Sequence, residues 1–289
     1  MFQLLTDTAS DLSFEYLKQN NIGYVGFTVN VDGIEYKTDI KGSLTPGHLL
    51  KLIREGKEPM TSQINVGHFL EFFKKYAKKG KPLLYLAFSS GLSGTYQSSM
   101  QAAEILKEED PELQITIVDT KAASNGMAVL IERAIKLRDE GMDISKVATE
   151  IEEIIPRVRS LVILDNLYHL QRGGRISKTT AVVGTILNVK PMVDVDSEGK
   201  LRQIGKIRGR EKALKYLVSQ TIGILDTTID QIIFISYSGD VEDAKKIKDM
   251  MLEVPTVKEV RINPLGPTIV THTGEGTVAI FSIAKVNRE

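Results

Sequence analysis

The sequence has no cysteine and only four histidines among its 289 residues. The absence of cysteine excludes disulfides, thiolate metal sites and thiol nucleophiles. Without an HExxH motif, a zinc site would need carboxylates drawn from distant segments. The 37 basic residues are balanced by 37 acidic ones, whereas a dedicated nucleic-acid binder carries a net basic surface. We therefore expect no metal, no cofactor and no nucleic-acid partner.

Long apolar runs and nucleotide motifs are also missing. No apolar stretch approaches the roughly 20 residues that span a bilayer, and the N-terminal MFQLLTDTASDL carries two aspartates and no basic region. It does not resemble a signal peptide, so a cytoplasmic location is expected. The Gly-Lys pairs that begin at 56, 80, 199 and 205 are followed by Glu, Pro, Leu and Ile, which excludes a P-loop.

What remains is the composition of an ordinary globular protein, with 42% hydrophobic and 26% charged residues. The length exceeds that at which a single core grows comfortably, so we expect two domains, 1–160 and 161–289. In the first, apolar strands such as 83–88 alternate with helical segments, which predicts a parallel sheet. In the second, strands such as 201–208 include antiparallel pairs. The predicted fold is α/β, with an N-terminal parallel-sheet domain and a smaller, mixed α+β C-terminal domain.

Three loops of the first half share a design. TDTASDL (6–12), TSQINVG (61–67) and SSGLSGT (89–95) are rich in Ser, Thr or Gly, and each precedes a helix. Free N–H groups at a helix start, close backbone approach at glycine and hydroxyl donors together suit a carboxylate or phosphate oxygen. Helix capping explains any one of these loops alone, but the three together favour an anion site.

Two stretches of the second half add candidates. His272 lies between two threonines in GPTIVTHTGEG (266–276), which we predict to be a loop; the alternative is a surface turn without a binding role. Arg172 and Arg175 flank a Gly-Gly pair, which is compatible with a solvated loop or with a second anion clamp.

Together these segments resemble the DegV family of bacterial fatty-acid-binding proteins, which includes the carrier subunits of the fatty-acid kinase system. The resemblance covers nearly the whole chain. Its landmarks, in the family's order, are TDTASDL (6–12), TSQ (61–63), SSGLSGTYQS (89–98), LYHLQRGGRIS (167–177) and GPTIVTHTGEG (266–276).

The resemblance implies a long-chain fatty acid buried between or beneath the two domains. Its carboxylate would be held by the TSQ and SGLSG loops and by the THTG histidine. The implied ligand-binding residues are Thr61, Ser62, Ser93, Gly94, His272 and Thr273. Contact with phosphate or a partner would come from Arg175 and Arg208.

The family scheme implies a carrier without its own nucleotide site. A separate ATP-dependent kinase phosphorylates the bound fatty acid, and the acyl phosphate passes to phospholipid synthesis, which allows a transient contact with a membrane surface. Two positions depart from the family pattern. Ile64 and Glu275 stand where proline is common, and Glu275 would place an acid near the carboxylate site.

The alternative reading is a serine hydrolase acting on acyl esters. Ser93, then Asp119 or Asp165, then His272 follow the Ser–Asp–His order of α/β-hydrolases. However, the nucleophile elbow requires G-x-S-x-G, and Ser93-Gly94 is followed here by Thr95. A Ser–His contact would serve a carboxylate clamp equally well.

Overall fold

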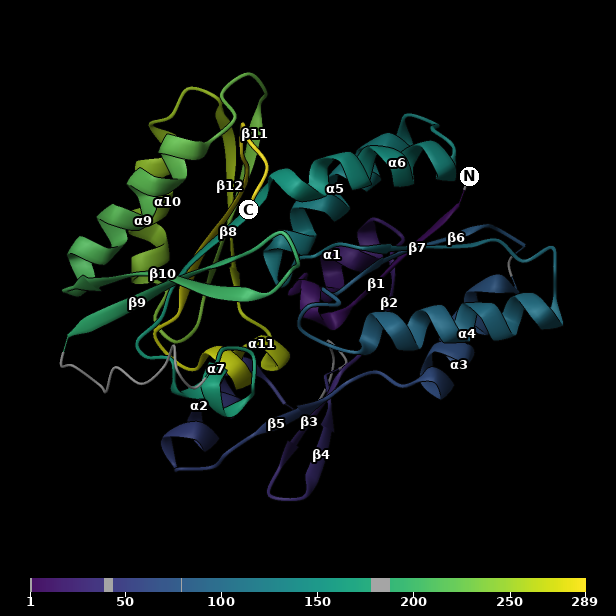
Figure 1. The fold of residues 1–289 in the computed structure, drawn as a ribbon, viewed down its shortest axis with the longest axis horizontal. Coiled ribbons are helices and arrows are strands. Elements are labelled where there is room, and N and C mark those ends of the chain that lie inside the picture. The colour runs from purple at the N-terminus through teal and green to yellow at the C-terminus, as the bar shows by residue number, and fades with distance from the viewer. Residues whose placement is uncertain (1, 39–43, 79, 178–187) are drawn as a thin grey trace.

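The structure is a computed structural model that describes residues 2–38, 44–78, 80–177 and 188–289. Figure 1 shows a parallel sheet built from the N-terminal half beside a mixed sheet built from the C-terminal half, with a small antiparallel sheet below the junction. The predicted fold class is thereby confirmed.

The N-terminal sheet has the strand order β2-β1-β6-β7, and its neighbours are all parallel. Helices cover both of its faces, α5 and α6 on one side and α3 and α4 on the other (Figure 1), which explains why β1 and β6 are buried along their whole length. A short helix, α1 (Phe14–Gln19), follows the first strand and its loop. The bounds of the other elements are β1 Gln3–Asp7, β2 Gly23–Val25, β6 Leu83–Ala87, β7 Ile115–Asp119, α3 Val66–Ala77, α4 Thr95–Glu109, α5 Asn125–Asp139 and α6 Ile144–Ile154.

The C-terminal sheet has the order β10-β9-β8-β13-β11-β12, in which only the pair β11–β12 is parallel among the described strands. Helices α9 (Arg210–Ile224) and α10 (Glu242–Leu252) cover its outer face, and α5 of the N-terminal half packs on its inner face. The strands are β8 Val158–Ile163, β9 Val189–Val195, β10 Leu201–Arg208, β11 Gln231–Tyr237, β12 Val257–Pro264 and β13 Val278–Ile283.

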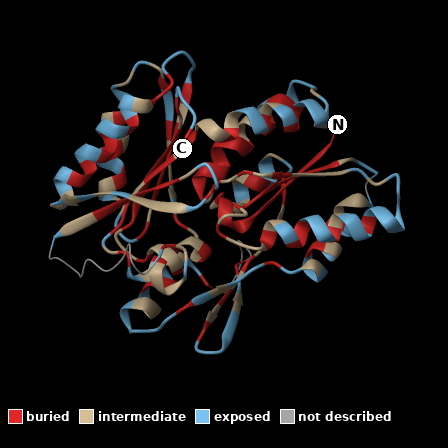
Figure 2. Cartoon of the chain, viewed as in Figure 1, coloured by how far each residue is buried: buried red, intermediate tan, exposed pale blue. Residues whose placement is uncertain are grey.

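The two halves are joined by a common core. Phe234 and Phe281 of the C-terminal sheet belong to the same buried cluster as Leu4 and Leu84 of the N-terminal sheet. Figure 2 shows this buried zone running through both sheets, while the outer helix faces are exposed. The predicted boundary at 160 falls inside β8. The junction is therefore a packed interface, and a ligand placed there would be shielded from water.

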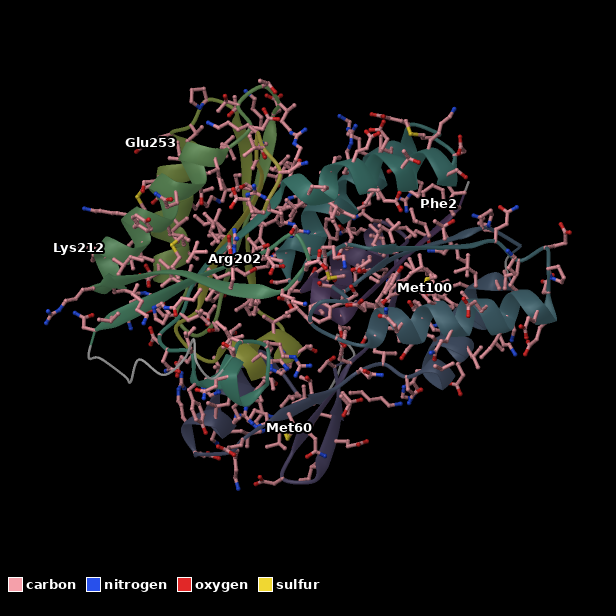
Figure 3. All side chains as sticks on the ribbon, viewed as in Figure 1. Phe2, Met60, Met100, Arg202, Lys212 and Glu253 are labelled. Carbon is pink, nitrogen blue, oxygen red and sulfur yellow. The ribbon has the colours of Figure 1, made fainter. Side chains whose placement is uncertain are left out.

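The small sheet has the order β4-β3-β5, with β3 Thr28–Val31, β4 Ile34–Lys37 and β5 Met60–Ser62. The pair Asp32-Gly33 between the segments 25–31 and 34–37 predicts a hairpin from the sequence. The structure confirms it, because β3 pairs with β4 and the two residues adopt the positive φ values, 52° and 83°, that such tight turns require. The predicted loop at 61–67 is wrong at its start, because Thr61 and Ser62 belong to β5, which pairs with β3. Met60 of β5 is 65% exposed, and Figure 3 shows Lys212 of α9 projecting outward from the body of the molecule.

The prediction of a loop at 266–276 is also wrong. Residues Pro267–Thr273 form helix α11. Proline at the first helical position and Gly274 at φ 74° after the last are the start and stop that the sequence contains. Helix α2 (Pro46–Arg54) and the short α7 (Tyr168–Arg172) pack against α11. Within the described ranges, no helix has the length and apolarity needed to cross a membrane.

Candidate functional site

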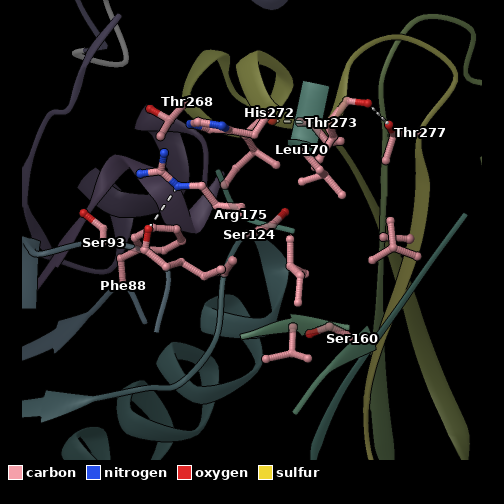
Figure 4. Close-up of a pocket in the computed structure, with 18 of the residues that line it drawn as sticks. Phe88, Ser93, Ser124, Ser160, Leu170, Arg175, Thr268, His272, Thr273 and Thr277 are labelled. Carbon is pink, nitrogen blue, oxygen red and sulfur yellow. Dashed lines mark hydrogen bonds between the residues drawn. The ribbon is translucent and has the colours of Figure 1, made fainter. Parts of the chain in front are cut away.

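A pocket lies at the junction of the three sheets, between α11, the loop after β6 and the inner face of the C-terminal sheet (Figure 4). Its empty volume, including the space at its mouth, is about 800 Å³. Its floor is apolar because alternate residues of adjacent strands face it: Val162, Val195, Leu201, Ala279 and Phe281. One group of lining residues is polar, and these side chains come from α11, β5 and the loops after β6 and α7: Thr61, Gln63, Ser93, Arg175, Thr268, His272 and Thr273.

Strand β5 explains which residues of the TSQ segment reach the pocket. Successive side chains of a strand point to opposite faces. Thr61 and Gln63 line the pocket, whereas Ser62 between them is not among the described lining residues. The resemblance implies that Ser62 binds the ligand, but among the described lining residues Gln63 takes its place. Had the segment been predicted as a strand, the alternation of its side chains would have placed Thr61 and Gln63 on one face and Ser62 on the other.

His272 is carried by α11 and faces Thr61 across the pocket, with 2.8 Å between its Nε2 and Thr61 Oγ1. Its Nδ1 is buried without a hydrogen-bond partner and lies against α7, where a Cβ on Gly173 would approach it to 2.2 Å. Burial, and then the positive charge of Arg175 and Arg172, lower the pKa of His272 to about 3. The imidazole is therefore neutral at physiological pH and acts as a hydrogen-bonding group without charge.

Arg175 brings a positive charge to the same end of the pocket. Its Nε donates to Leu92 O at 3.2 Å, and its Nη1 donates to Gly173 O, so the side chain ties the turn after α7 to the loop after β6. Burial lowers the pKa of Arg175, but a guanidinium stays protonated at neutral pH. Among the described lining residues it is the permanent cation, and it would attract a carboxylate or phosphate.

Ser93 lies just before α4. Its Oγ accepts from the backbone N–H of Thr95 at 3.2 Å and is 2.9 Å from Thr95 Oγ1. Gly94 is the N-cap of α4 and is not among the described lining residues; a Cβ there would come within 2.3 Å of Gln63 Oε1. Gly94 thus allows Gln63 to approach the start of α4. The resemblance implies that Gly94 itself binds the ligand, whereas in the structure it makes room for a lining residue.

The polar end is the open end of the pocket. Thr61, Ser93 and Arg175 are partly exposed, whereas Ser160 and Phe281 at the far side are buried. In Figure 4 Ser160 lies on the opposite side of the lining residues from His272. Prediction from the sequence did not include Ser124, Ser160 or Thr268, all of which line the pocket.

The TDTASDL loop does not line the pocket in the described structure but supports it from behind. Asp7 accepts from Tyr85 Oη at 2.7 Å and from Phe88 N at 2.9 Å. Asp11 accepts from Ser124 Oγ at 2.5 Å and from Gly266 N, at the start of α11, at 2.9 Å. Burial raises the pKa of Asp7 to about 6 and that of Asp11 to about 7.

The two departures from the family pattern have local explanations. Glu275 pairs with Arg54, whose Nε donates to Glu275 Oε2 at 2.8 Å, and it is not among the described lining residues. Ile64 is buried, and its N–H donates to Thr95 Oγ1 at 3.2 Å, a bond that proline could not make. Arg208 is exposed at the end of β10, likewise outside the described lining.

The hydrolase arrangement is not assembled among the described residues. His272 contacts Thr61, whereas Ser93 contacts Thr95. Asp119 Oδ1 accepts from Ser90 N, and Asp165 pairs with Lys190, so the unpartnered Nδ1 of His272 lacks the carboxylate that a triad needs. Across the described ranges, no group of three or more His, Asp or Glu side chains is placed to hold a metal ion.

The fold and the site define a class: a two-part α/β protein whose junction encloses an apolar pocket with one polar, open end. The family model described as "Uncharacterised protein, DegV family" matches residues 1–285, and the chain belongs to the DegV family. It is 47% identical over 288 residues to the DegV domain-containing protein YteA of Lactococcus lactis, covering 100% of this chain and 99% of that one.

Solved structures of the family have the same fold. A DegV family protein from Thermus thermophilus, described by its fatty acid binding, superposes with a TM-score of 0.88 at 30% identity and covers 98% of this chain and 99% of its own. A fatty acid binding DegV family protein from Streptococcus agalactiae superposes with a TM-score of 0.85 at 27% identity, with 99% of both chains covered.

Proposed function

We propose that this chain binds a long-chain fatty acid in the pocket at the junction of its sheets, with the carboxylate at the polar end and the acyl chain along the apolar floor. The observation that carries the proposal is the convergence of Thr61, Ser93, Arg175 and His272 on the open end of an otherwise apolar pocket. The fatty-acid binding of the Thermus and Streptococcus relatives supports it.

The physical balance favours such a ligand. A long acyl chain presents on the order of several hundred Å² of apolar surface, and each Å² removed from water contributes about 25 cal/mol. The carboxylate must be matched by hydrogen bonds when it leaves water. Hydroxyl donors from Thr61 and Ser93 would supply these bonds, and the charge of Arg175 would balance that of the carboxylate.

The proposal is tested by equilibrium binding to the delipidated protein. Palmitic acid is compared with hexadecanol, which has the same chain without the carboxylate. We expect saturable 1:1 binding of the acid and at least roughly tenfold weaker binding of the alcohol, because hydrogen bonds to charged groups are the stronger ones. Equal affinity for both would leave an apolar pocket but remove the carboxylate assignment.

We further propose that the protein is a carrier and not an enzyme. It would present the carboxylate to a separate ATP-dependent fatty-acid kinase and then carry the acyl phosphate toward phospholipid synthesis at a membrane surface. The open position of the polar end supports this role, since a partner could reach the carboxylate while the acyl chain stays buried.

The exposed Arg208 allows the partner step to be tested apart from ligand binding. With purified kinase subunit and ATP, acyl phosphate trapped as the hydroxamate should form only when the loaded carrier is present. Arg208→Glu should reduce that product while leaving fatty-acid affinity unchanged, because Arg208 is not among the described lining residues. If Arg208→Glu formed as much acyl phosphate as the wild type, Arg208 would not belong to the partner contact. If the wild-type protein formed no acyl phosphate, the carrier role would be contradicted.

A further inference from the structure

One polar atom at the far side of the pocket is unexplained by carboxylate binding. Ser160, in the middle of β8, is 3% exposed and lines the pocket. Its Oγ is buried and has no hydrogen-bond partner. Its neighbours on the same face of the sheet, Val162, Ala279 and Phe281, are apolar, so the sheet offers this hydroxyl no polar partner.

Strand register places Ser160 well away from the polar end. Ser160 is directly opposite Phe281 on β13. Phe281 is four residues beyond Thr277, whose Oγ1 contacts Thr273 O at the polar end. At about 3.3 Å per strand residue, Ser160 lies about 13 Å along the pocket from that end. An extended acyl chain anchored by its carboxylate would pass Ser160 near the middle of its length.

A second hydroxyl of the pocket belongs to the helix that packs on Ser160. Ser124, at the start of α5, also lines the pocket and is 3% exposed. It donates its proton to Asp11 and its Oγ lies 3.3 Å from Ser236 Oγ; a hydroxyl oxygen has two lone pairs, so the second can accept a bond from the pocket side. Two residues further on, α5 packs so closely that a Cβ on Gly126 would lie 3.0 Å from Ser160 Oγ.

We propose that this far part of the pocket recognises an acyl chain with a hydrogen-bonding oxygen near its middle, such as a hydroxy fatty acid, and that Ser160 is the residue that selects it. This inference rests on the proposed function. A chain without a hydroxyl would leave the buried Ser160 hydroxyl unpaired, which is unfavourable. A mid-chain hydroxyl would accept from Ser160 and donate to Ser124.

The chain offers a matched control on the same sheet. Ser282 Oγ is also buried without a partner, but Ser282 is next to Phe281 on β13 and therefore points to the opposite face. It is not among the described lining residues. Ser160→Ala and Ser282→Ala thus remove the same group from neighbouring positions, one inside the pocket and one outside it.

The test compares the affinities of the delipidated proteins for stearic acid and for stearic acid with a hydroxyl on its tenth carbon. We expect Ser160→Ala to lower the ratio of hydroxystearate to stearate affinity by roughly three- to tenfold, the strength of one net hydrogen bond. Ser282→Ala should leave the ratio unchanged. An equal ratio in all three proteins would overturn the proposal.

A second measurement uses only the wild-type protein, so it tests the proposal even if Ser160→Ala does not fold. Moving the hydroxyl from the tenth to the second carbon should weaken binding relative to the mid-chain isomer. Equal or tighter binding of the second-carbon isomer would also overturn the proposal. Tight stearate binding without a positional preference would leave the fatty-acid function standing, whereas no binding of any acid would remove the function itself.

Discussion

Thr61 and His272 are 211 positions apart in the chain, yet Thr61 Oγ1 lies 2.8 Å from His272 Nε2. Thr61 belongs to a strand of the small sheet and His272 to α11 of the C-terminal half. Their contact forms one wall of the open end of the pocket. Because the imidazole is neutral, with a pKa lowered to about 3, the pair offers hydrogen bonds without adding a second positive charge beside Arg175.

The first prediction concerns the face of β5 that reaches the ligand. Thr61→Val keeps the shape of the side chain and removes its hydroxyl, so fatty-acid affinity should fall by roughly three- to tenfold. Ser62→Ala, one residue along on the exposed face, should leave affinity unchanged. Isothermal titration of both delipidated variants makes the comparison. If Ser62→Ala were the one to weaken binding, the orientation of β5 would be wrong.

The second prediction concerns the support of His272 by α7. Gly173 has a right-handed backbone, with φ −72° and ψ −9°, which alanine adopts without strain. Its added Cβ would nevertheless meet His272 Nδ1 at 2.2 Å. Gly173→Ala should therefore displace the imidazole and reduce the fatty acid that copurifies with the protein. Gly47→Ala, on α2 with no atom near its added Cβ, is the control, and equal ligand content in both variants would contradict the contact.

The third prediction concerns Asp11, the buried carboxyl that joins the starts of α5 and α11. Burial raises its pKa from 3.8 to about 7, so the folded state holds the proton more tightly than the unfolded state does. The stability that this provides is fully present below pH 4 and is lost as the pH rises through about 7. Since one pKa unit corresponds to about 1.4 kcal/mol, the loss amounts to at most about 4 kcal/mol.

Asp11→Asn mimics the protonated carboxyl, because the amide oxygen can accept from Gly266 N and the amide nitrogen can donate to Ser124 Oγ. Urea unfolding should show similar stability of the two proteins near pH 4 and a more stable variant at pH 8. His272 also titrates, but it is common to both proteins. The charge repulsion between Asp7 and Asp11, which helps to raise the pKa of Asp11, is absent from the variant and adds to its stability at pH 8. A pH-independent difference would mean that the pKa of Asp11 is not raised.

The fourth prediction separates binding from hydrolysis. Ser93 Oγ contacts Thr95 and not His272, so it lacks the base that would activate it. A fluorophosphonate probe at high concentration should leave Ser93 unlabelled, as judged by intact-protein mass spectrometry, while a known serine hydrolase in the same tube is labelled. Stoichiometric modification of Ser93 would restore the hydrolase alternative.

Much of the fold follows from local patterns in the sequence. The apolar runs of β6 and β7 predict the parallel sheet, and the Asp32-Gly33 turn predicts the hairpin. Both predictions succeed because burial and turn geometry act over a few residues. Helix α11 was missed although its start and stop, Pro267 and Gly274, were present. Its threonines and its histidine have weak helix propensity, and packing against α2 and α7 supplies what the local sequence lacks.

The site was predictable only where motifs marked it. Of the residues named from the resemblance, Thr61, Ser93, Arg175, His272 and Thr273 line the pocket, while Ser62, Gly94 and Arg208 are not among its described lining residues. Ser160 could not have been found from the sequence, since a lone serine in an apolar strand has no distinguishing pattern. Its role emerges only from the register that places it opposite Phe281.

The most direct test of the fatty-acid assignment is mass spectrometry of the small molecules released when the purified protein is denatured. We predict a long-chain fatty acid at close to one molecule per chain, and its strong reduction in His272→Ala. A pocket that releases no fatty acid, and that takes up none when long-chain acids are added to the delipidated protein, would contradict the account.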